Sequence, residues 1–133
     1  MRALFVVVIM VLFASCSKPN SSEPKGPVFD DRSKFVGTWA GSYSCLGGTP
    51  NADTLVIRLA NAELDFSIII HKQYAFTDTV TGSLTESNVI TVPEQTMGGF
   101  PGTAKITFKN ELLEYRQSGF GITCGGADYA RVR

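Results

Sequence analysis

From Lys34 to the C-terminus, short runs of alternating apolar and polar residues are separated by turn residues about every 8 to 12 positions. A period of two is typical of half-buried β-strands, and no stretch has the period of a long amphipathic helix. Eight such runs follow one another with short turns between them. Because short turns make consecutive strands antiparallel, the sequence predicts an all-β, eight-stranded, up-and-down barrel.

We expect strands at 34–45, 54–60, 64–71, 74–84, 89–93, 103–109, 112–117 and about 124–132. The segments 95–102 and 118–126 are then loops that are unusually apolar. In an up-and-down barrel the loops after odd-numbered strands share one end, so these two segments form a rim together with 46–53. We predict that the rim binds a ligand through Met97, Phe100, Phe120 and Ile122. The alternative is that these side chains fold over and plug the barrel.

The first strand carries Gly37, Trp39, Gly41, Tyr43 and Cys45 on one face, which we take as the interior. Cys45 ends this strand and Cys124 begins the last one. If the two cysteines lie opposite each other, Thr38 lies across from Arg131 and Trp39 across from Ala130. A disulfide there would close the barrel at the seam between its first and last strands, and closure would remove exposed strand edges.

The N-terminus has the features of an export signal. Arg2 is followed by an apolar run of about 11 residues, too short for a membrane-spanning helix and typical of a signal peptide. The segment Phe13-Ala14-Ser15-Cys16 resembles the lipobox of bacterial lipoproteins, which implies that Cys16 is acylated and anchored in a bilayer. The chain then divides into a signal peptide (1–15), a lipidated cysteine with a flexible tether (16–33) and a barrel domain (34–133). An ordinary secretory peptide is the alternative.

Lipidation of Cys16 leaves Cys45 and Cys124 as an even pair in an oxidising compartment, and we predict that they form a disulfide. Two buried free thiols or metal ligands are the alternatives. Two thiols without a nearby histidine make a poor zinc site, so no metal is expected.

Composition and motifs argue against several functions. If Arg2 is removed with the signal peptide, eleven Lys and Arg remain beside twelve Asp and Glu, and no segment is a block of like charges. The chain therefore has no basic patch that would favour binding to nucleic acid. The sole histidine, His71, falls on the outward face of its strand, as a solvated turn residue. No phosphate-binding glycine loop and no nucleophile elbow occurs. We therefore predict a non-catalytic protein without a cofactor.

The segment Phe35-Val36-Gly37-Thr38-Trp39 resembles the opening of the calycin barrels, the group of lipocalins and fatty-acid-binding proteins. The resemblance implies a lipocalin-like barrel in which Gly37 and Trp39 have structural roles and Trp39 packs across one end. It also implies a basic stacking partner on the last strand, for which Arg131 is the candidate.

Two functions are consistent with these features. The first is a monomeric lipoprotein of the cell envelope, in the outer membrane of a Gram-negative bacterium, that binds a small apolar ligand in or at the mouth of the barrel. The second is a module that docks on or inhibits another protein through the rim loops.

Overall fold

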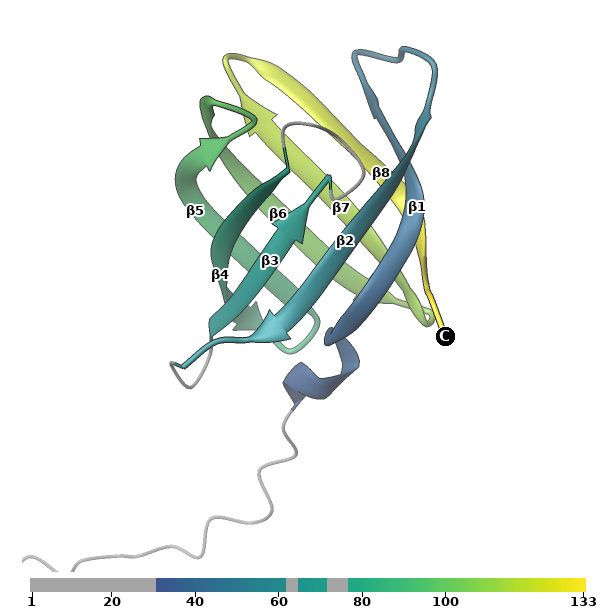
Figure 1. Cartoon of the computed structure of the whole chain (residues 1–133), viewed down its shortest axis with the longest axis vertical. Coiled ribbons are helices and arrows are strands. Elements are labelled where there is room, and N and C mark those ends of the chain that lie inside the picture. The colour runs from purple at the N-terminus through teal and green to yellow at the C-terminus, as the bar shows by residue number, and fades with distance from the viewer. Residues whose placement is uncertain (1–30, 62–64, 72–76) are drawn as a thin grey trace, which may run out of the picture.

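The computed structural model describes residues 31–61, 65–71 and 77–133 of the 133-residue chain. Eight antiparallel strands form a closed barrel in which β1 pairs with both β2 and β8 (Figure 1). This arrangement confirms the predicted up-and-down barrel with pairing of the first and last strands. No helix in the described ranges has the length and apolar character needed to cross a membrane. The elements are η1 (Asp31–Lys34), β1 (Gly37–Cys45), β2 (Asn51–Leu59), β3 (Asp65–Ile70), β4 (Asp78–Glu86), β5 (Val89–Met97), β6 (Phe100–Lys109), β7 (Leu112–Gly119) and β8 (Ile122–Arg131).

The two ends of the barrel differ in what they carry. One end, which we call the mouth, holds the turns between β1 and β2, β5 and β6, and β7 and β8 (Figure 1). The opposite end, which we call the closed end, holds η1, the turns between β4 and β5 and between β6 and β7, and the C-terminus. The predicted grouping of the turns after odd-numbered strands is therefore correct for the three of them that are described.

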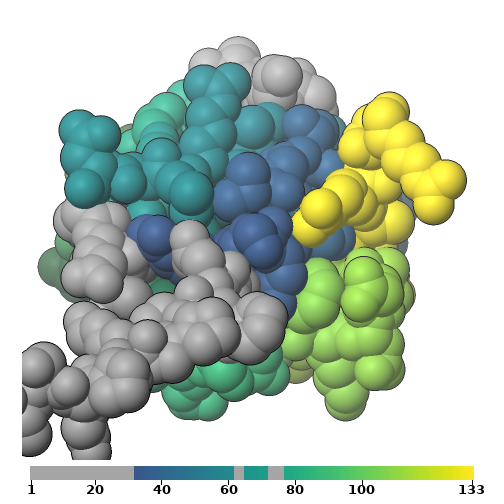
Figure 2. Space-filling model, turned by 90° about the horizontal axis from the view of Figure 1, so that it is seen from below, coloured from purple at the N-terminus to yellow at the C-terminus, as the bar shows by residue number. Residues whose placement is uncertain are grey.

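Aromatic rings fill the closed end. The ring of Phe35 lies edge-on to those of Phe66 and Phe108, with centroids 5.7 and 5.9 Å apart, and Trp39 contacts Phe108 in the same way at 6.2 Å. The indole Nε1–H of Trp39 donates to the carbonyl of Phe35 at 2.8 Å. Viewed from below, the segment with η1 and the start of β1 lies near the middle of this end (Figure 2). The turn after η1 thus brings a buried ring under the barrel.

Arg131 lies on the outside of this ring cluster. Its guanidinium carbon is 4.7 Å from the centroid of the Trp39 ring, and it donates to the carbonyl of Lys34. A cation over an indole face is held by the quadrupole of the ring. Arg131 therefore links the last strand to both η1 and β1.

The barrel interior is packed with side chains along its length. Alternation places one residue in two inside, as the sequence predicts for β3, whose even-numbered residues are buried. The packing is close at Gly82, where a Cβ would lie 2.7 Å from Ile90. The buried core residues are Phe35, Trp39, Leu55, Ile57, Phe66, Ile68, Ile70, Val80, Ile90, Val92, Met97, Ala104, Ile106, Leu113, Tyr115 and Tyr129. Leu59, which is in phase with the buried Leu55 and Ile57, is exposed at the end of β2.

The seam between β1 and β8 contains a bulge that the sequence analysis missed. Cys45 pairs with Cys124 and is joined to it by a disulfide, but Trp39 pairs with Arg131, one position away from the predicted partner Ala130. Five steps on β8 thus face four on β1. Glycine allows the strands to approach here, because a Cβ on Gly126 would lie 1.7 Å from the carbonyl oxygen of Ser42.

Two predicted loops are mostly strand. β5 continues to Met97 and β6 begins at Phe100, so 95–102 is a hairpin rather than a flexible loop. Its turn is Gly98 and Gly99, with φ values of 64° and 83°, which glycine adopts without strain. Likewise β7 reaches Gly119 and β8 begins at Ile122. The apolar residues of these segments are therefore held on rigid hairpin tips.

Other strand boundaries also differ from the prediction. β1 begins at Gly37 and not at Lys34, which belongs to η1, and β2 begins three residues early, at Asn51. β4 begins at Asp78, and the first residues predicted for that strand, 74–76, lie outside the described residues. The predictions for the signal peptide 1–15, for Cys16 and for most of the tether lie outside the described residues.

Candidate functional site

An apolar groove of about 380 Å³ opens at the mouth of the barrel. Side chains from β1, β5, β6, β7 and β8 contribute to it, and the disulfide of the seam forms part of one wall. Its lining residues are Cys45, Leu46, Met97, Phe100, Pro101, Gln117, Gly119, Phe120, Ile122 and Cys124. A volume of this size holds one small molecule.

All four residues that the sequence analysis proposed as a binding surface line this groove. Met97 points into the barrel and is buried, whereas Phe100 and Phe120 are 63% and 72% exposed. Ile122 is exposed at the start of β8. The rings of Phe100 and Phe120 meet edge-on at 5.7 Å across neighbouring hairpins. Only Met97 behaves as a plug, while the other three remain accessible.

Gln117 is the polar residue of the groove. It lies one inward position closer to the mouth than Tyr115 on β7, and its Oε1 accepts a hydrogen bond from the Tyr115 hydroxyl at 2.9 Å. The hydroxyl of Tyr43 donates to the same oxygen at 3.3 Å, and Nε2 of His71 lies 3.4 Å from it. The amide oxygen of Gln117 is therefore turned toward the barrel interior.

Below Gln117 lies a buried carboxylate paired with the histidine. Asp53 is 1% exposed and His71 is 4% exposed. Oδ1 of Asp53 is 3.2 Å from Nδ1 of His71 and accepts the backbone N–H of Thr54 at 2.8 Å. Oδ2 accepts the hydroxyl of Tyr129 at 2.6 Å. These bonds satisfy a carboxylate that would otherwise be costly to bury.

The electrostatics of this cluster fix the direction of its hydrogen bonds. Burial alone would raise the pKa of the Asp53 carboxyl. The hydrogen bonds from His71 and Tyr129, the charge of His71 and the Thr54 amide lower the pKa by more than burial raises it, so the pKa of Asp53 lies below the ordinary 3.8. Burial, and then the Asp53 charge, raise the pKa of Tyr43 to about 12. Burial likewise raises the pKa of Tyr115 and of Tyr129. The three phenols therefore remain protonated and act as donors.

The prediction that His71 is a solvated turn residue was wrong. Alternation from Ile68 and Ile70 places the next side chain outside, but His71 has a φ of 51°, which breaks the alternation and turns the imidazole inward. Its ring packs against Tyr43 at 4.4 Å. The hydroxyl of Thr77 donates to the His71 carbonyl at 2.9 Å.

Sequence reasoning also missed Asp53 and Gln117, although a signal for both was present. Asp53 stands two residues before the buried Leu55, and Gln117 two residues after the buried Tyr115. Each is in phase with the interior of its strand. Alternation alone would have assigned both residues to the interior, but polar residues are normally expected on the outside of a strand.

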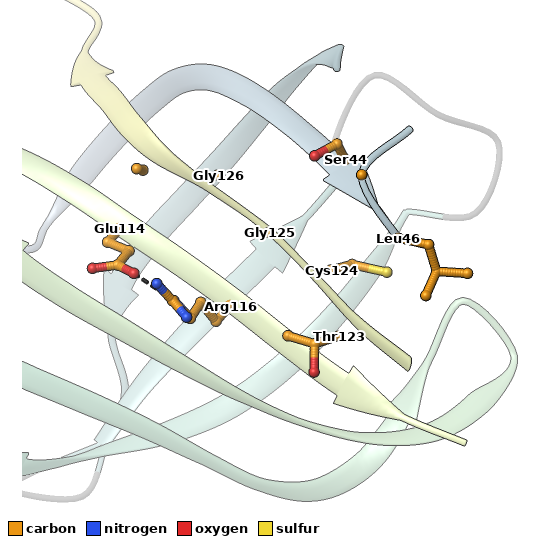
Figure 3. A pocket seen from close by; sticks show the side chains of 10 residues that line it. Ser44, Leu46, Glu114, Arg116, Thr123, Cys124, Gly125 and Gly126 are labelled. Atoms are coloured by element: carbon orange, nitrogen blue, oxygen red, sulfur yellow. Dashed lines mark hydrogen bonds and ion pairs between the residues drawn. The ribbon is translucent and has the colours of Figure 1, made fainter. Parts of the chain in front are cut away.

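A second hollow, of about 300 Å³, lies on the outer wall where β8 meets β7 and β1 (Figure 3). Glu114 and Arg116, which form an ion pair on the outward face of β7, stand at one side of it, and Leu46 and Cys124 at the other. Polar and charged side chains, among them Ser44 and Thr123, contribute to its lining, and the Arg116 side chain is exposed. We regard the groove at the mouth as the better candidate, because its wall is apolar and formed by converging hairpins.

Among the described residues, the mouth therefore holds an apolar groove with the amide of Gln117 at its base. A buried hydrogen-bonded cluster of Asp53, His71 and the tyrosines lies beneath that amide. Within those residues, no group of three or more His, Cys, Asp and Glu side chains could hold a metal ion. Comparisons of the chain with protein-family models, with curated proteins and with solved structures give no match.

Proposed function

We propose that this protein is an exported, non-catalytic lipoprotein that binds a small apolar ligand in the groove at the mouth of its barrel. The observation that carries the proposal is the groove itself, in which two exposed phenylalanines face a buried methionine around a space of ligand size. The packed interior favours the mouth over the barrel centre as the binding position. Like the lipocalin-like proteins that it resembles in its first strand, the chain would act as a carrier or sensor.

The anchor proposal rests on the sequence around Cys16. Acyl chains on that cysteine would hold the protein in the envelope, in the outer membrane of a Gram-negative cell. Fourteen residues lie between Cys16 and Asp31, where η1 begins, and this segment could span roughly 50 Å when extended. The described chain begins at the closed end (Figure 1), so this tether would join the barrel at the end opposite the mouth.

Binding is tested by native mass spectrometry of protein purified from the membranes of its own host, followed by titration of the delipidated protein with butylbenzene. We expect a retained small molecule, and butylbenzene binding that Phe100→Ser and Phe120→Ser each weaken. Leu59→Ser is the matched control, because Leu59 is an exposed apolar residue outside the groove. Equal affinity in all four proteins would refute the groove as the site.

Anchoring has a separate test. Intact mass of the mature protein should show an acylated Cys16 as the first residue, and Cys16→Ala should move the protein from the membrane to the soluble fraction. A mature N-terminus elsewhere, without acyl mass, would overturn the lipoprotein assignment and leave the groove untouched.

The second candidate function is docking on a protein through the rim. It is favoured by the exposure of the tips, where Leu46 is 77% exposed beside Phe100 and Phe120. In that case the native mass spectrum would contain a co-purifying polypeptide and no small molecule.

A further inference from the structure

The amide nitrogen of Gln117 has no acceptor in the part of the chain that the structure describes. The Oε1 atom receives the hydroxyls of Tyr43 and Tyr115 and faces His71, which leaves Nε2 on the other side of the amide plane. No fully buried side-chain nitrogen or oxygen among the described residues lacks a partner, so Nε2 must retain access to the space before it. Because Gln117 lines the groove, that space is the groove.

Two features show where the amide nitrogen lies. A Cβ built on Gly102 would lie 3.7 Å from Nε2 of Gln117 and 3.7 Å from Cε of Met97. Because Gly102 has no side chain, a small space remains there, and both the amide nitrogen of Gln117 and the terminal methyl group of Met97 border it. Met97 and Gln117 come from β5 and β7, on either side of β6.

The amide cannot turn over without cost. Both phenols donate to Oε1, and burial raises the pKa of each above the ordinary 10, so both keep the proton that they donate. Rotating the amide by half a turn would place N–H groups against these hydroxyls and would leave their hydrogens without the acceptor that they have now. The cluster below the groove therefore pre-organises Gln117 with its donor toward the ligand.

Charge is absent from the groove wall. None of the described residues that line it is Asp, Glu, Lys, Arg or His. The ionisable groups of the cluster, Asp53 and His71, lie beneath Gln117 and are paired with each other. An anionic ligand would find no cation among the described residues that line the groove, while an uncharged acceptor would meet a ready donor.

We propose that the ligand is an uncharged amphipathic molecule, with a carbonyl or ether oxygen that accepts a hydrogen bond from Nε2 of Gln117 and an apolar body between Met97, Phe100 and Phe120. This inference rests on the proposed function of the groove and specifies the ligand class. Gln117 then selects among apolar molecules, because a molecule without an acceptor leaves the donor unpaired.

Three probes, each a phenyl ring on a four-carbon chain, separate the possibilities: benzylacetone has a ketone at the third chain carbon, 4-phenylbutyrate a carboxylate at the fourth, and butylbenzene neither. In a titration followed by NMR, we expect the side-chain amide signals of Gln117 to shift with benzylacetone and to stay nearly unchanged with butylbenzene. Phenylbutyrate should bind most weakly. These readings use the unmodified protein, so they do not depend on a variant that folds.

Variants then test the role of the amide. Gln117→Glu keeps oxygen acceptors for the hydroxyls of Tyr43 and Tyr115 but removes the donor, and Gln117→Met keeps the length and removes all polarity. We expect both to lower the affinity for benzylacetone by three- to tenfold relative to the affinity for butylbenzene. Gln95→Met, on β5 and outside the groove, should leave the ratio of the two affinities unchanged.

The outcomes distinguish the two proposals. If butylbenzene and benzylacetone bind and their affinity ratio is the same in wild type and in both Gln117 variants, the groove stands and the ligand class is wrong. If phenylbutyrate binds best, the uncharged head is wrong. If no probe perturbs the groove, both this inference and the proposed function fail.

Discussion

The two ends of the barrel are held together in different ways. At the closed end, Phe35, Trp39 and the rings around them bury one another, and Arg131 covers the outer face of the indole. At the mouth, large apolar side chains stay exposed, and a disulfide and a buried hydrogen-bond cluster maintain the shape. The closed end thus draws its stability from the burial of apolar area, and the mouth from covalent and polar links.

This difference has a functional consequence. Apolar side chains that are packed away contribute to folding, and those left at a rim remain available to a ligand. A mouth sealed with rings like the closed end would be more stable, but it would have no groove. Linking the mouth by Cys45–Cys124 and by Asp53 keeps it rigid without using Phe100, Phe120 or Ile122.

The largest expected effect is on the closed end. Trp39→Ala should lower the free energy of unfolding by about 3 to 5 kcal/mol, because it leaves a cavity among buried rings. Urea denaturation measures the loss, and butylbenzene titration of the folded variant should give wild-type affinity. Trp39→Phe keeps a ring but loses the bond to the Phe35 carbonyl, and should cost less. A parallel loss of groove affinity would show that the two ends are not independent.

The next effect is on the mouth. Replacing both Cys45 and Cys124 by Ser should cost about 2 to 4 kcal/mol, because the bond joins residues 79 apart in sequence and limits the unfolded chain. Unlike Trp39→Ala, it should also weaken butylbenzene binding, since the disulfide forms part of the groove wall. Urea denaturation and the same titration measure the two effects. Unchanged affinity would mean that the hairpins hold the wall without the bond.

A smaller effect comes from the carboxylate below the groove. Asp53→Asn should cost about 1 to 3 kcal/mol at neutral pH, because an amide cannot accept from both His71 and Tyr129 as the carboxylate does. The pKa of Asp53 is lower in the folded state than its ordinary 3.8, so the folded state binds the proton more weakly. The stabilisation is therefore present above pH 3.8 and disappears as pH falls through the folded pKa.

The measurement for this prediction is the urea midpoint of wild type and of Asp53→Asn between neutral pH and pH 2. The gap between the two proteins should be constant above pH 5 and should narrow in acid. Asp128→Asn, at an exposed position of β8, is the control and should follow the wild type throughout. A gap that does not change with pH would show that the amide destabilises by its shape and not by the loss of charge.

The barrel could be predicted from the sequence because its determinants are periodic. Alternation located all eight strands, and the positions of Cys45 and Cys124 indicated which strands close the ring. The one-residue error in the seam has a local cause, since a bulge changes the register without changing the hydrophobic pattern. Gly125 and Gly126 indicate where a bulge could form, but the presence of glycine does not determine which of the two strands carries the extra residue.

The apolar part of the candidate site could also be predicted, because Met97, Phe100, Phe120 and Ile122 stand out among turn residues. Its polar floor could not. The inward turn of His71 depends on one positive φ, which no residue type near it requires. Asp53 is buried and Gln117 is half-buried, and the two are linked through His71 and the tyrosines. Such a network of hydrogen bonds between strands is not visible in a linear pattern.

The smallest effect concerns the ring pair at the mouth. A double-mutant cycle with Phe100→Ala and Phe120→Ala should give a coupling energy of about 0.5 kcal/mol or less in unfolding, because both rings are largely exposed although their centroids are 5.7 Å apart. The same cycle on Phe35 and Phe66, at the same separation but fully buried, should give a clearly larger value. Urea denaturation of the seven proteins, with the wild type common to the two cycles, measures both. Equal coupling energies at the two ends would mean that Phe100 and Phe120 contribute to folding as core residues do. The two rings would then not be a surface that is kept available for a ligand.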